Sequence, residues 1–432
     1  MAEIDINQRS ACTGGLHVLL PTLGSMGDVL PVVALGMALK KRGHRPTVIT
    51  NELFSDTIRS AGLDFIALGT AAEARETIAD PRLWHPTKGL QCIAERLIVP
   101  NIPRLYDILA HQSSPNAVVA ASGLCLGARV AQEKLGVRLA TIHLQPSVLR
   151  SLVDSGRYGL IPMGPRVPRA VKKALFWLFD HVFIDKHILP GLNTFRAQLG
   201  LAPVQRVFQT YLHSPQLVIG LFPEWFAPPQ PDWPPNTQLA GFVLPDGGED
   251  FEIPAEADQF LSAGPRPVIF TAGSAAATLE RFFRESVEAC RIGGFRALLV
   301  TTYMDQLPAV LPSDVRAFSY LPFSRVLPRC AALVHHGGIG TLAQAIKAQL
   351  PQVVVPNSHD QPDNGYRVER LGLGYRIQPG RYHARYVASR LAELMVSAEI
   401  RQRCRDFAAK IDSDAALGHA CSWIEQLAQH PN

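Results

Sequence analysis

The stretch AALVHHGGIGTLAQAIKAQLPQVVVP, residues 331–356, decides the fold of this chain. AALVHH is a short apolar run of strand type, the next segment opens with glycines and has helical spacing, and PQVVVP resumes as a strand. Strand, glycine turn, helix and strand in this order form the βαβ unit of a parallel sheet. The stretch therefore predicts an α/β domain with a doubly wound, Rossmann-like sheet.

The same alternation occurs near the start of the chain. LHVLLP (16–21) is a strand-type run, residues 29–44 have helical spacing and end in basic residues beside Gly43, and RPTVIT (45–50) is again strand-like. Further strand, helix and strand segments follow at 116–121, 126–136 and 137–143. We therefore predict a second doubly wound domain ahead of the first.

A Pro-rich stretch, FAPPQPDWPPN (226–236), separates the two regions. Such a segment is stiff and cannot continue a helix or a sheet, which favours a linker. Two doubly wound domains joined in this way face each other across a cleft, at the carboxyl ends of their strands, where ligands of such sheets bind. The predicted divisions are a flexible tail at 1–15, an N-terminal domain at 16–225, a linker at 226–245, a C-terminal domain at 246–410, and a C-terminal helix at 411–432 that returns toward the N-terminal domain.

The composition excludes several classes of protein. With 432 residues, 47% hydrophobic and 18% charged, the chain can bury large cores, and its net charge of +5 has no dense Lys/Arg block that would favour nucleic acid. Seven scattered cysteines without a C-x-x-C pair indicate reduced thiols, not disulfides or a zinc site. The first residues do not resemble a secretory signal, and no stretch approaches the roughly 18 apolar residues of a membrane span. We expect a cytoplasmic protein; its oligomeric state stays open.

The motif HHGGIGT (335–341) lies where a strand passes into a helix. Gly337, Gly338 and Gly340 allow close backbone approach, and the helix N-terminus offers free N–H groups to a phosphate. His336 and Thr341 can add hydrogen bonds to the same oxygens. The pattern predicts a diphosphate site that needs no metal, although a tight turn in a parallel sheet would use the same glycines.

The second motif, PNSHDQPDN (356–364), follows the next strand. Asp360, Gln361 and Asn364 place a carboxylate beside amides at the edge of the cleft, which suits a grip on vicinal sugar hydroxyls. An Asx-rich loop that caps the following helix is the alternative.

The third motif, LGSMGDVLP (23–31), forms the first turn of the N-terminal domain. Its glycines do not fit G-x-G-x-x-G and no ribose-binding acid follows, which disfavours a nicotinamide enzyme. Asp28, at the helix start, can cap the helix or can take the proton from an acceptor hydroxyl as a general base. A helix N-terminus lowers the pKa of a carboxylate, which keeps Asp28 ionised but weakens it as a base, so burial of the acceptor beside it would have to compensate.

These three motifs in this order resemble the nucleotide-sugar glycosyltransferases of the GT-B fold. HGGIGT with HDQPDN resembles their donor signature, which ends D-Q-x-x-N, and GSMGDV before Pro31 resembles the bacterial antibiotic and sterol glycosyltransferases. The resemblance implies an inverting, metal-independent transfer without a cofactor. It assigns the acceptor to the N-terminal domain, the donor to the C-terminal domain and the general base to Asp28.

The resemblance also implies individual contacts to the donor. His336 matches the phosphate-contacting histidine, Asp360 and Gln361 match the pair that holds sugar hydroxyls, and Asn364 closes the signature. Ser274 falls where a small hydroxyl residue meets the diphosphate, Tyr320 where an aromatic residue stacks on the base, and Gln344 where a ribose-binding Glu is usual. The neutral Gln344 weakly favours a deoxyribose donor such as dTDP.

A closer resemblance covers nearly the whole chain. DPRLW (80–84), LGARVAQEKLGV (126–137), HSPQ (213–216) and LFPEWFAPPQPDWP (221–234) resemble the rhamnosyltransferases of rhamnolipid biosynthesis. That resemblance implies dTDP-rhamnose as donor and an apolar, hydroxyl-bearing acceptor such as a hydroxyalkanoyl lipid. The alternatives are a UDP-glucose-dependent enzyme that acts on sterol, polyketide or flavonoid-like acceptors, and a nucleotide-sugar epimerase.

Three further segments have two interpretations each. His143, at a strand end, can line the acceptor site or be a capped loop histidine. The triplet DSD (412–414) imitates a metal-binding D-x-D, but its place among the last helices favours a cap, and we expect no metal. RVPRAVKKALFWLFDHVF (166–183) alternates basic and apolar faces, so it can lie on an anionic membrane, admit a fatty acceptor or pack as an ordinary domain helix.

Overall fold

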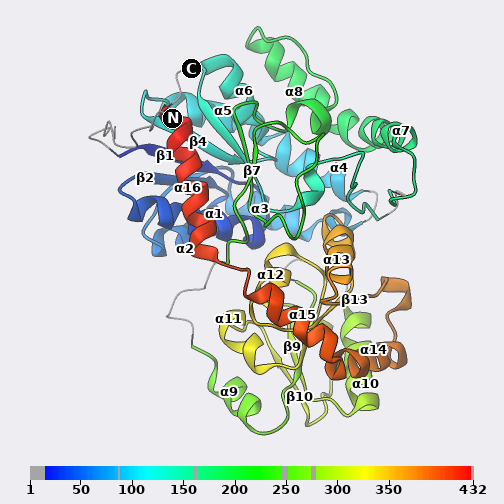
Figure 1. The fold of residues 1–432 in the computed structure, drawn as a ribbon. Helices are drawn as coiled ribbons and strands as arrows, with labels where there is room; N and C mark the ends of the chain where they lie inside the picture. The colour runs from blue at the N-terminus through cyan, green and yellow to red at the C-terminus, as the bar shows by residue number, and fades with distance from the viewer. Residues whose placement is uncertain (1–14, 86–87, 160–162, 245–251, 274–278, 430–432) are drawn as a thin grey trace, which may run out of the picture.

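The computed structural model describes residues 15–85, 88–159, 163–244, 252–273 and 279–429. Two sheets, each made of parallel strands, lie one above the other in Figure 1, and helices cover both faces of each. This confirms the α/β architecture of two Rossmann-like domains that the sequence predicts. No helix among the described residues is long and apolar enough to cross a membrane.

The N-terminal sheet has the strand order β3-β2-β1-β4-β5-β6-β7. This order reverses direction beside β1, as in doubly wound sheets, and leaves the crevice for ligands at the carboxyl ends of β1 and β4. Its strands are β1 (His17–Pro21), β2 (Arg45–Thr50), β3 (Asp64–Ala67), β4 (Ala117–Ser122), β5 (Arg138–His143), β6 (Leu217–Gly220) and β7 (Thr237–Leu239). Its α-helices are α1 (Met26–Lys41), α2 (Ser55–Ser60), α3 (Ala71–Ala79), α4 (Gly89–Ile93), α5 (Asn101–Gln112), α6 (Leu126–Leu135), α7 (Arg169–Phe179) and α8 (Lys186–Gln198).

The C-terminal sheet repeats this topology with the order β10-β9-β8-β11-β12-β13. Its strands are β8 (Val268–Thr271), β9 (Ala297–Val300), β10 (Val315–Phe318), β11 (Ala332–His335), β12 (Gln352–Val354) and β13 (Gly374–Arg376). Its helices are α9 (Ala255–Ser262), α10 (Glu280–Gly293), α11 (Phe323–Val326), α12 (Ile339–Lys347), α13 (Gln361–Arg370), α14 (Ala384–Val396) and α15 (Ala398–Ala408).

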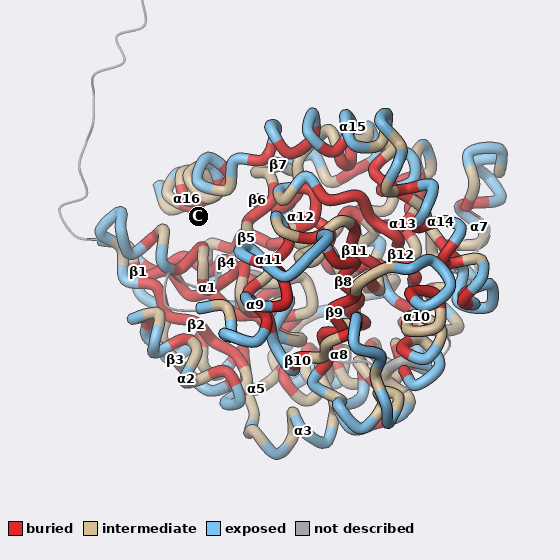
Figure 2. Tube along the Cα trace, turned by 90° about the horizontal axis from the view of Figure 1, so that it is seen from below, coloured by how far each residue is buried: buried red, intermediate tan, exposed pale blue. Residues whose placement is uncertain are grey.

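Alternating residues of each strand enter different cores, because successive side chains point to opposite faces of a sheet. On β1, Leu19 packs with residues of α5, α6 and α8, whereas Val18 and Leu20 pack with residues of α1 and α16. Figure 2 shows the resulting pattern, with buried strands inside and exposed helix surfaces around them.

The Pro-rich stretch differs from our expectation of a linker at 226–245. Residues 237–239 form β7, which pairs with β6, so the N-terminal sheet extends beyond the expected boundary at 225. Phe226 and Trp233 of this stretch are buried in a cluster with Leu342 and Phe407 of the C-terminal domain. The stretch is therefore part of an apolar interface between the domains, and hydrogen-bonded turns at 223–227, 230–233 and 234–237 shape its backbone.

The chain passes between the domains twice. The first passage follows β7, and the second leads from α15 to α16 (Ser413–Gln429), which lies along α1 in the N-terminal domain (Figure 1). The Leu244 backbone N–H donates to the Ser413 hydroxyl (3.0 Å), so the two passages adjoin. The Asp412 carboxylate accepts from the Ala415 backbone N–H (2.9 Å), which gives the DSD triplet the capping position.

Candidate active site

The turn between β11 and α12 requires glycine at its first position. Gly337 has φ +98°, and a Cβ there would lie 2.7 Å from Val354 Cγ1. Behind the turn, the buried His335 ring accepts from the Gly337 backbone N–H (3.2 Å) and pairs with the Gln352 side chain (2.9 Å). His335 therefore shapes the turn and does not face the cleft.

His336 lies at the N-terminus of α12 with its ring against two glycines. A Cβ on Gly273 would lie 2.7 Å from His336 Cε1, and one on Gly338 would lie 2.5 Å from Nε2. Burial lowers the pKa of His336 to about 4, so the ring is neutral at pH 7. Its Nδ1 is buried without a partner in the described part of the chain, which leaves this atom for a ligand. Ser274, next to Gly273, lies outside the described residues.

The loop between β12 and α13 is bonded to the glycine turn through Asn364. Its Nδ2 donates to the Gly337 carbonyl (2.9 Å) and to Asp360 Oδ2 (2.6 Å), and its Oδ1 is buried without a described partner. Gln361 Oε1 accepts from two backbone N–H groups of its own loop (2.8 and 3.1 Å). Only the amide NH2 of Gln361 is therefore left to donate to a sugar hydroxyl.

Asp28 lies in the first turn of α1, after the N-cap residue Ser25. Its Oδ2 accepts from the Ser25 backbone N–H (2.7 Å) and from the Ser25 hydroxyl (3.0 Å). Burial of the carboxylate raises the pKa of Asp28, and the Ser25 hydrogen bonds oppose this only in part. Asp28 therefore closes the helix end, and its role as a general base stays a prediction.

Asp360 of the C-terminal domain lies close to Asp28 of the N-terminal domain. Burial, reinforced by the negative charge of Asp28, raises the pKa of Asp360 to about 7. Two motifs that are more than 300 residues apart in the sequence are therefore brought within electrostatic range of each other. One carries the base candidate and the other a candidate grip on the sugar.

The other predicted donor contacts are distributed along the C-terminal sheet. Gly340, Thr341 and Gln344 lie on α12 and are partly exposed. Tyr320 is 54% exposed at the carboxyl end of the edge strand β10, three strands away from β11. Within the described chain, no three His, Cys, Asp or Glu side chains are grouped as a metal site.

His143 is buried at the carboxyl end of β5. Its Nε2 is 2.9 Å from Nδ1 of His213, and the rings meet edge to face. Burial lowers the pKa of His143 well below its usual value and that of His213 to about 4, so both are neutral at pH 7. The pairing accounts for the burial of His143, and its contact with an acceptor stays a prediction.

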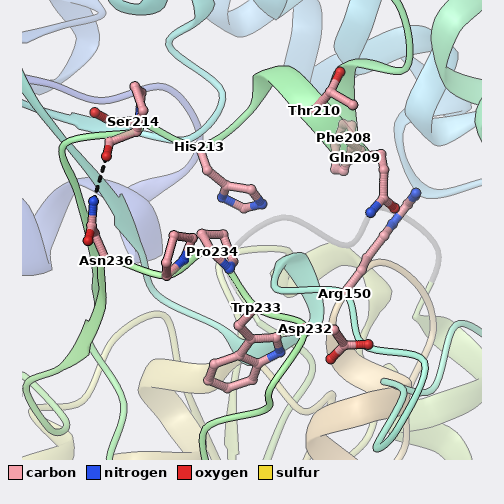
Figure 3. Close-up of a pocket in the computed structure, with 12 residues that line it drawn as sticks. Arg150, Phe208, Gln209, Thr210, His213, Ser214, Asp232, Trp233, Pro234 and Asn236 are labelled. Carbon is pink, nitrogen blue, oxygen red and sulfur yellow. Dashed lines mark hydrogen bonds between the residues drawn. The ribbon is translucent and has the colours of Figure 1, made fainter.

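A hollow of about 290 Å³ lies beside this histidine pair (Figure 3). His213, Arg150, Asp232 and Trp233 line it, and the Trp233 indole N–H is buried without a described partner. Neither Asp28 nor the glycine turn contributes to its lining. The hollow thus belongs to the N-terminal domain and not to the cluster of donor motifs.

The sequence interpretation did not include the contacts that hold α13 against the N-terminal domain. Asp363, buried on α13, accepts from the Arg157 backbone N–H (2.9 Å) and forms an ion pair with Arg367 (2.8 Å). Arg367 also donates to the Phe226 carbonyl (2.9 Å). The four-residue spacing of Asp363 and Arg367 is typical of a helix ion pair and could have indicated it.

A second contact fixes the same loop from the other side. His359, at φ +58°, hydrogen-bonds to the Leu83 backbone, and the guanidinium of Arg157 stacks 4.0 Å from the Tyr366 ring centroid. The helix that begins with Asp360 and Gln361 is therefore positioned by N-terminal residues as well as by its own domain.

Two Rossmann-like domains, with the glycine turn after β11 in one and Asp28 after β1 in the other, are the architecture of a GT-B glycosyltransferase. Residues 18–152 match the glycosyltransferase family 28 N-terminal domain, and residues 297–417 match the erythromycin biosynthesis protein CIII-like C-terminal domain. The chain belongs to this family of glycosyltransferases.

Its relatives are glycosyltransferases, and some of their names state an acceptor. Glycosyltransferase GtfE of Amycolatopsis orientalis is 30% identical over 83% of this chain and 85% of its own length. The O-mycaminosyltylonolide 6-deoxyallosyltransferase of Streptomyces fradiae is 28% identical over 96% of this chain and 98% of its own length. A sterol 3-beta-glucosyltransferase of Arabidopsis thaliana is 25% identical over 95% of this chain and 66% of its own length.

Solved structures show the same fold. The glycotransferase of kitacinnamycin superposes with a TM-score of 0.73 at 18% identity, over 96% of this chain and 99% of its own. The glycosyltransferase VinC in complex with DTDP superposes with a TM-score of 0.67 at 20% identity, over 96% and 100% of the two chains.

Proposed function

We propose that the protein catalyses an inverting, metal-independent transfer of rhamnose from dTDP-rhamnose to a hydroxyl group of a hydroxyalkanoyl lipid. The observation that supports the mechanism is that the negative charge of Asp28 in one domain reaches Asp360 in the other, so the two carboxylates lie within electrostatic range of each other. A single displacement needs a base for the acceptor hydroxyl and side chains that hold the sugar of the donor. Here one domain supplies the candidate base and the other supplies the candidate sugar-binding carboxylate.

In the proposed reaction, the Asp28 carboxylate takes the proton of the acceptor hydroxyl. The acceptor oxygen forms a bond to the anomeric carbon while the bond from that carbon to the diphosphate oxygen breaks on the opposite face. The diphosphate leaves toward the N-terminus of α12, where backbone N–H groups and the neutral His336 ring stabilise its charge without a cation. The Asp360 carboxylate and the Gln361 amide hold sugar hydroxyls.

The choice of donor and acceptor is supported by the sequence and by the relatives. The quoted stretches at 80–84, 126–137 and 221–234 resemble the rhamnosyltransferases of rhamnolipid biosynthesis, and the neutral Gln344 suits a deoxyribose. One structural neighbour binds DTDP. The competing assignment is a UDP-glucose-dependent enzyme with a sterol or antibiotic-like acceptor, which the names of several relatives favour. We give an epimerase less weight, because that reaction needs further acid and base groups.

The assay mixes the purified protein with dTDP-rhamnose or UDP-glucose, each with a hydroxyalkanoyl lipid, a sterol or a flavonoid, and detects products by mass spectrometry. We expect a rhamnosylated lipid from dTDP-rhamnose alone, at a rate that EDTA does not change. Glucosylated sterol or flavonoid would replace the substrate assignment, donor conversion without an acceptor would indicate an epimerase, and loss of activity in EDTA would contradict the metal-independent mechanism.

A further inference from the structure

The outward face of α7 combines apolar and basic side chains. Val171, Trp177 and Leu178 are 46%, 53% and 50% exposed, although large apolar residues usually lie inside. They occupy one side of the helix, at spacings of six and seven residues. The exposed charges between residues 164 and 186 are the cations Arg166, Arg169, Lys173 and Lys186.

The two acids of this region are turned into the protein. Asp180 and Asp185 begin and end the π-helical turn η5 (Asp180–Asp185), and both are buried. Asp180 pairs with Arg150 (2.5 Å), and the Asp185 carboxylate accepts from the Val207 backbone N–H (3.0 Å). Internal pairing of both acids leaves the outer surface of residues 164–186 with positive charge alone.

The inner face of α7 anchors the helix without help from the outer face. Lys172 is buried, and its Nζ donates to the carbonyls of Leu152 and Val153 (3.2 Å each). Phe176 is buried as well and meets the Tyr158 ring edge to face at 5.6 Å. Because these contacts hold the helix in place, the exposed apolar side chains are not needed for its packing.

We propose that α7 docks the protein on an anionic phospholipid bilayer. Its outer apolar side chains enter the boundary between headgroups and acyl chains, while the surrounding cations contact lipid phosphates. α7 continues through η5 into α8, and no helix among the described residues is long and apolar enough to cross a bilayer, so we place α7 in the plane of the membrane. Trp is the side chain most suited to that boundary, because its ring is apolar and its N–H is polar.

The shape of this surface favours lipid over a protein partner. A stable protein interface buries about 1,000 Å² or more with close complementarity, whereas α7 is a single convex helix at the margin of the molecule (Figure 1). Lipids adapt to a convex helix. The loop that accepts from Lys172 also carries Arg157, whose N–H bonds to Asp363 on α13, so a docked α7 would bring the cleft close to the membrane.

The test is cosedimentation of the full chain with vesicles of phosphatidylcholine, alone or with 30% phosphatidylglycerol. We expect binding to the phosphatidylglycerol vesicles at low salt, weakening as salt rises, and little binding to phosphatidylcholine alone. The variants Trp177→Glu/Leu178→Glu and Arg169→Glu/Lys173→Glu should each weaken binding at least about tenfold. The matched controls Ile292→Glu and Arg291→Glu, on exposed positions of α10, should bind as the wild type does.

A second measurement does not depend on the charge-reversed variants folding. Brominated lipids quench a Trp that enters the bilayer, and Trp177→Phe should remove most of that quenching while leaving thermal unfolding and nucleotide binding unchanged. Equal binding to both vesicle types, wild-type binding by Trp177→Glu/Leu178→Glu, or quenching that persists in Trp177→Phe would each overturn the proposal. None of these results depends on which sugar or acceptor the enzyme uses, so the proposal can fail while the proposed function stands.

Discussion

Two opposing effects act on the pKa of Asp28. The Ser25 backbone and hydroxyl donate to its carboxylate and stabilise the charge, whereas burial destabilises the charge and raises the pKa. A base must be ionised but must also hold a proton well, and a raised pKa moves Asp28 toward that balance. Burial of Asp28 itself thus opposes the lowering of its pKa at the helix N-terminus.

Replacing Asp28 by Asn should therefore abolish transfer but preserve nucleotide binding. Asn keeps the volume and can still accept from Ser25, but it cannot take a proton. We expect the rate of transfer to fall by about 10²–10⁴-fold, with the dissociation constant for dTDP changed by less than about threefold. Single-turnover kinetics and calorimetry measure the two quantities, and parallel loss of both would refute the role of base.

Donor binding should depend on pH through Asp360. Because burial and the charge of Asp28 raise the pKa of Asp360 to about 7, the group gains its charge as pH rises through neutrality. The carboxylate accepts from sugar hydroxyls better than the acid does, so donor affinity should increase from pH 6 to pH 8. Calorimetric titration of the sugar nucleotide checks this, with Asp360→Asn as the control, in which the dependence should be absent. A dependence that persists in this variant would assign it to another group.

At the scale of elements, two glycines near the start of α12 have different structural roles. Gly337 has φ +98° and no room for a Cβ, whereas a Cβ on Gly340 meets nothing within 4 Å. One glycine is required by backbone conformation and close packing. The other lies in the helix, where Ala would be the better helix former.

Replacing each glycine by Ala should give effects of opposite sign. Gly337→Ala should lower the free energy of unfolding by about 1–3 kcal/mol, because of strain and the contact with Val354. Gly340→Ala should raise it by about 0.5–1 kcal/mol. Urea unfolding monitored by circular dichroism compares the two; equal destabilisation would contradict the distinction.

Helices and strands with a local apolar pattern were predictable from the sequence. The strand β7, which the sequence did not predict, lacks such a pattern. The strand-type run at 45–50 is β2 with the same bounds, because a continuous apolar run gives a local signal. β7 is three residues long, TQL, and follows prolines, so no periodicity marks it. It is a strand only because it pairs with β6, and this pairing joins residues that are distant in the sequence.

In the candidate site, too, single residues could be selected from the sequence, whereas contacts between distant residues could not. Asp28, His336 and Asp360 were predicted because each belongs to a short motif at the end of a strand. The proximity of Asp28 to Asp360 was not predictable, because it depends on how the domains meet. The His143–His213 pair was not predictable either, because 70 residues separate its members within the N-terminal domain and only the fold brings them together.

At the scale of the whole molecule, the buried pair of Asp363 and Arg367 joins α13 to the N-terminal domain. Asp363→Asn leaves the Arg367 charge buried without its partner and should lower the free energy of unfolding by about 3–5 kcal/mol. The matched control is Asp154→Asn, which breaks the more exposed pair with Arg370 (3.0 Å) and should cost less than about 1 kcal/mol. Chemical denaturation measures both, and similar small losses would show that the buried pair does not stabilise the contact of α13 with the N-terminal domain.

The two adjoining passages of the chain restrict how the domains can move. A single connection would permit rotation of one domain in every direction. Two connecting segments that are hydrogen-bonded to each other at Leu244 and Ser413 favour rotation about one hinge axis. That axis runs beside α16, and α13 lies on the far side of the molecule in Figures 1 and 2. Rotation about this axis would therefore displace the domains most at the edge where α13 meets the N-terminal domain. We expect the sugar nucleotide and the acceptor to enter there.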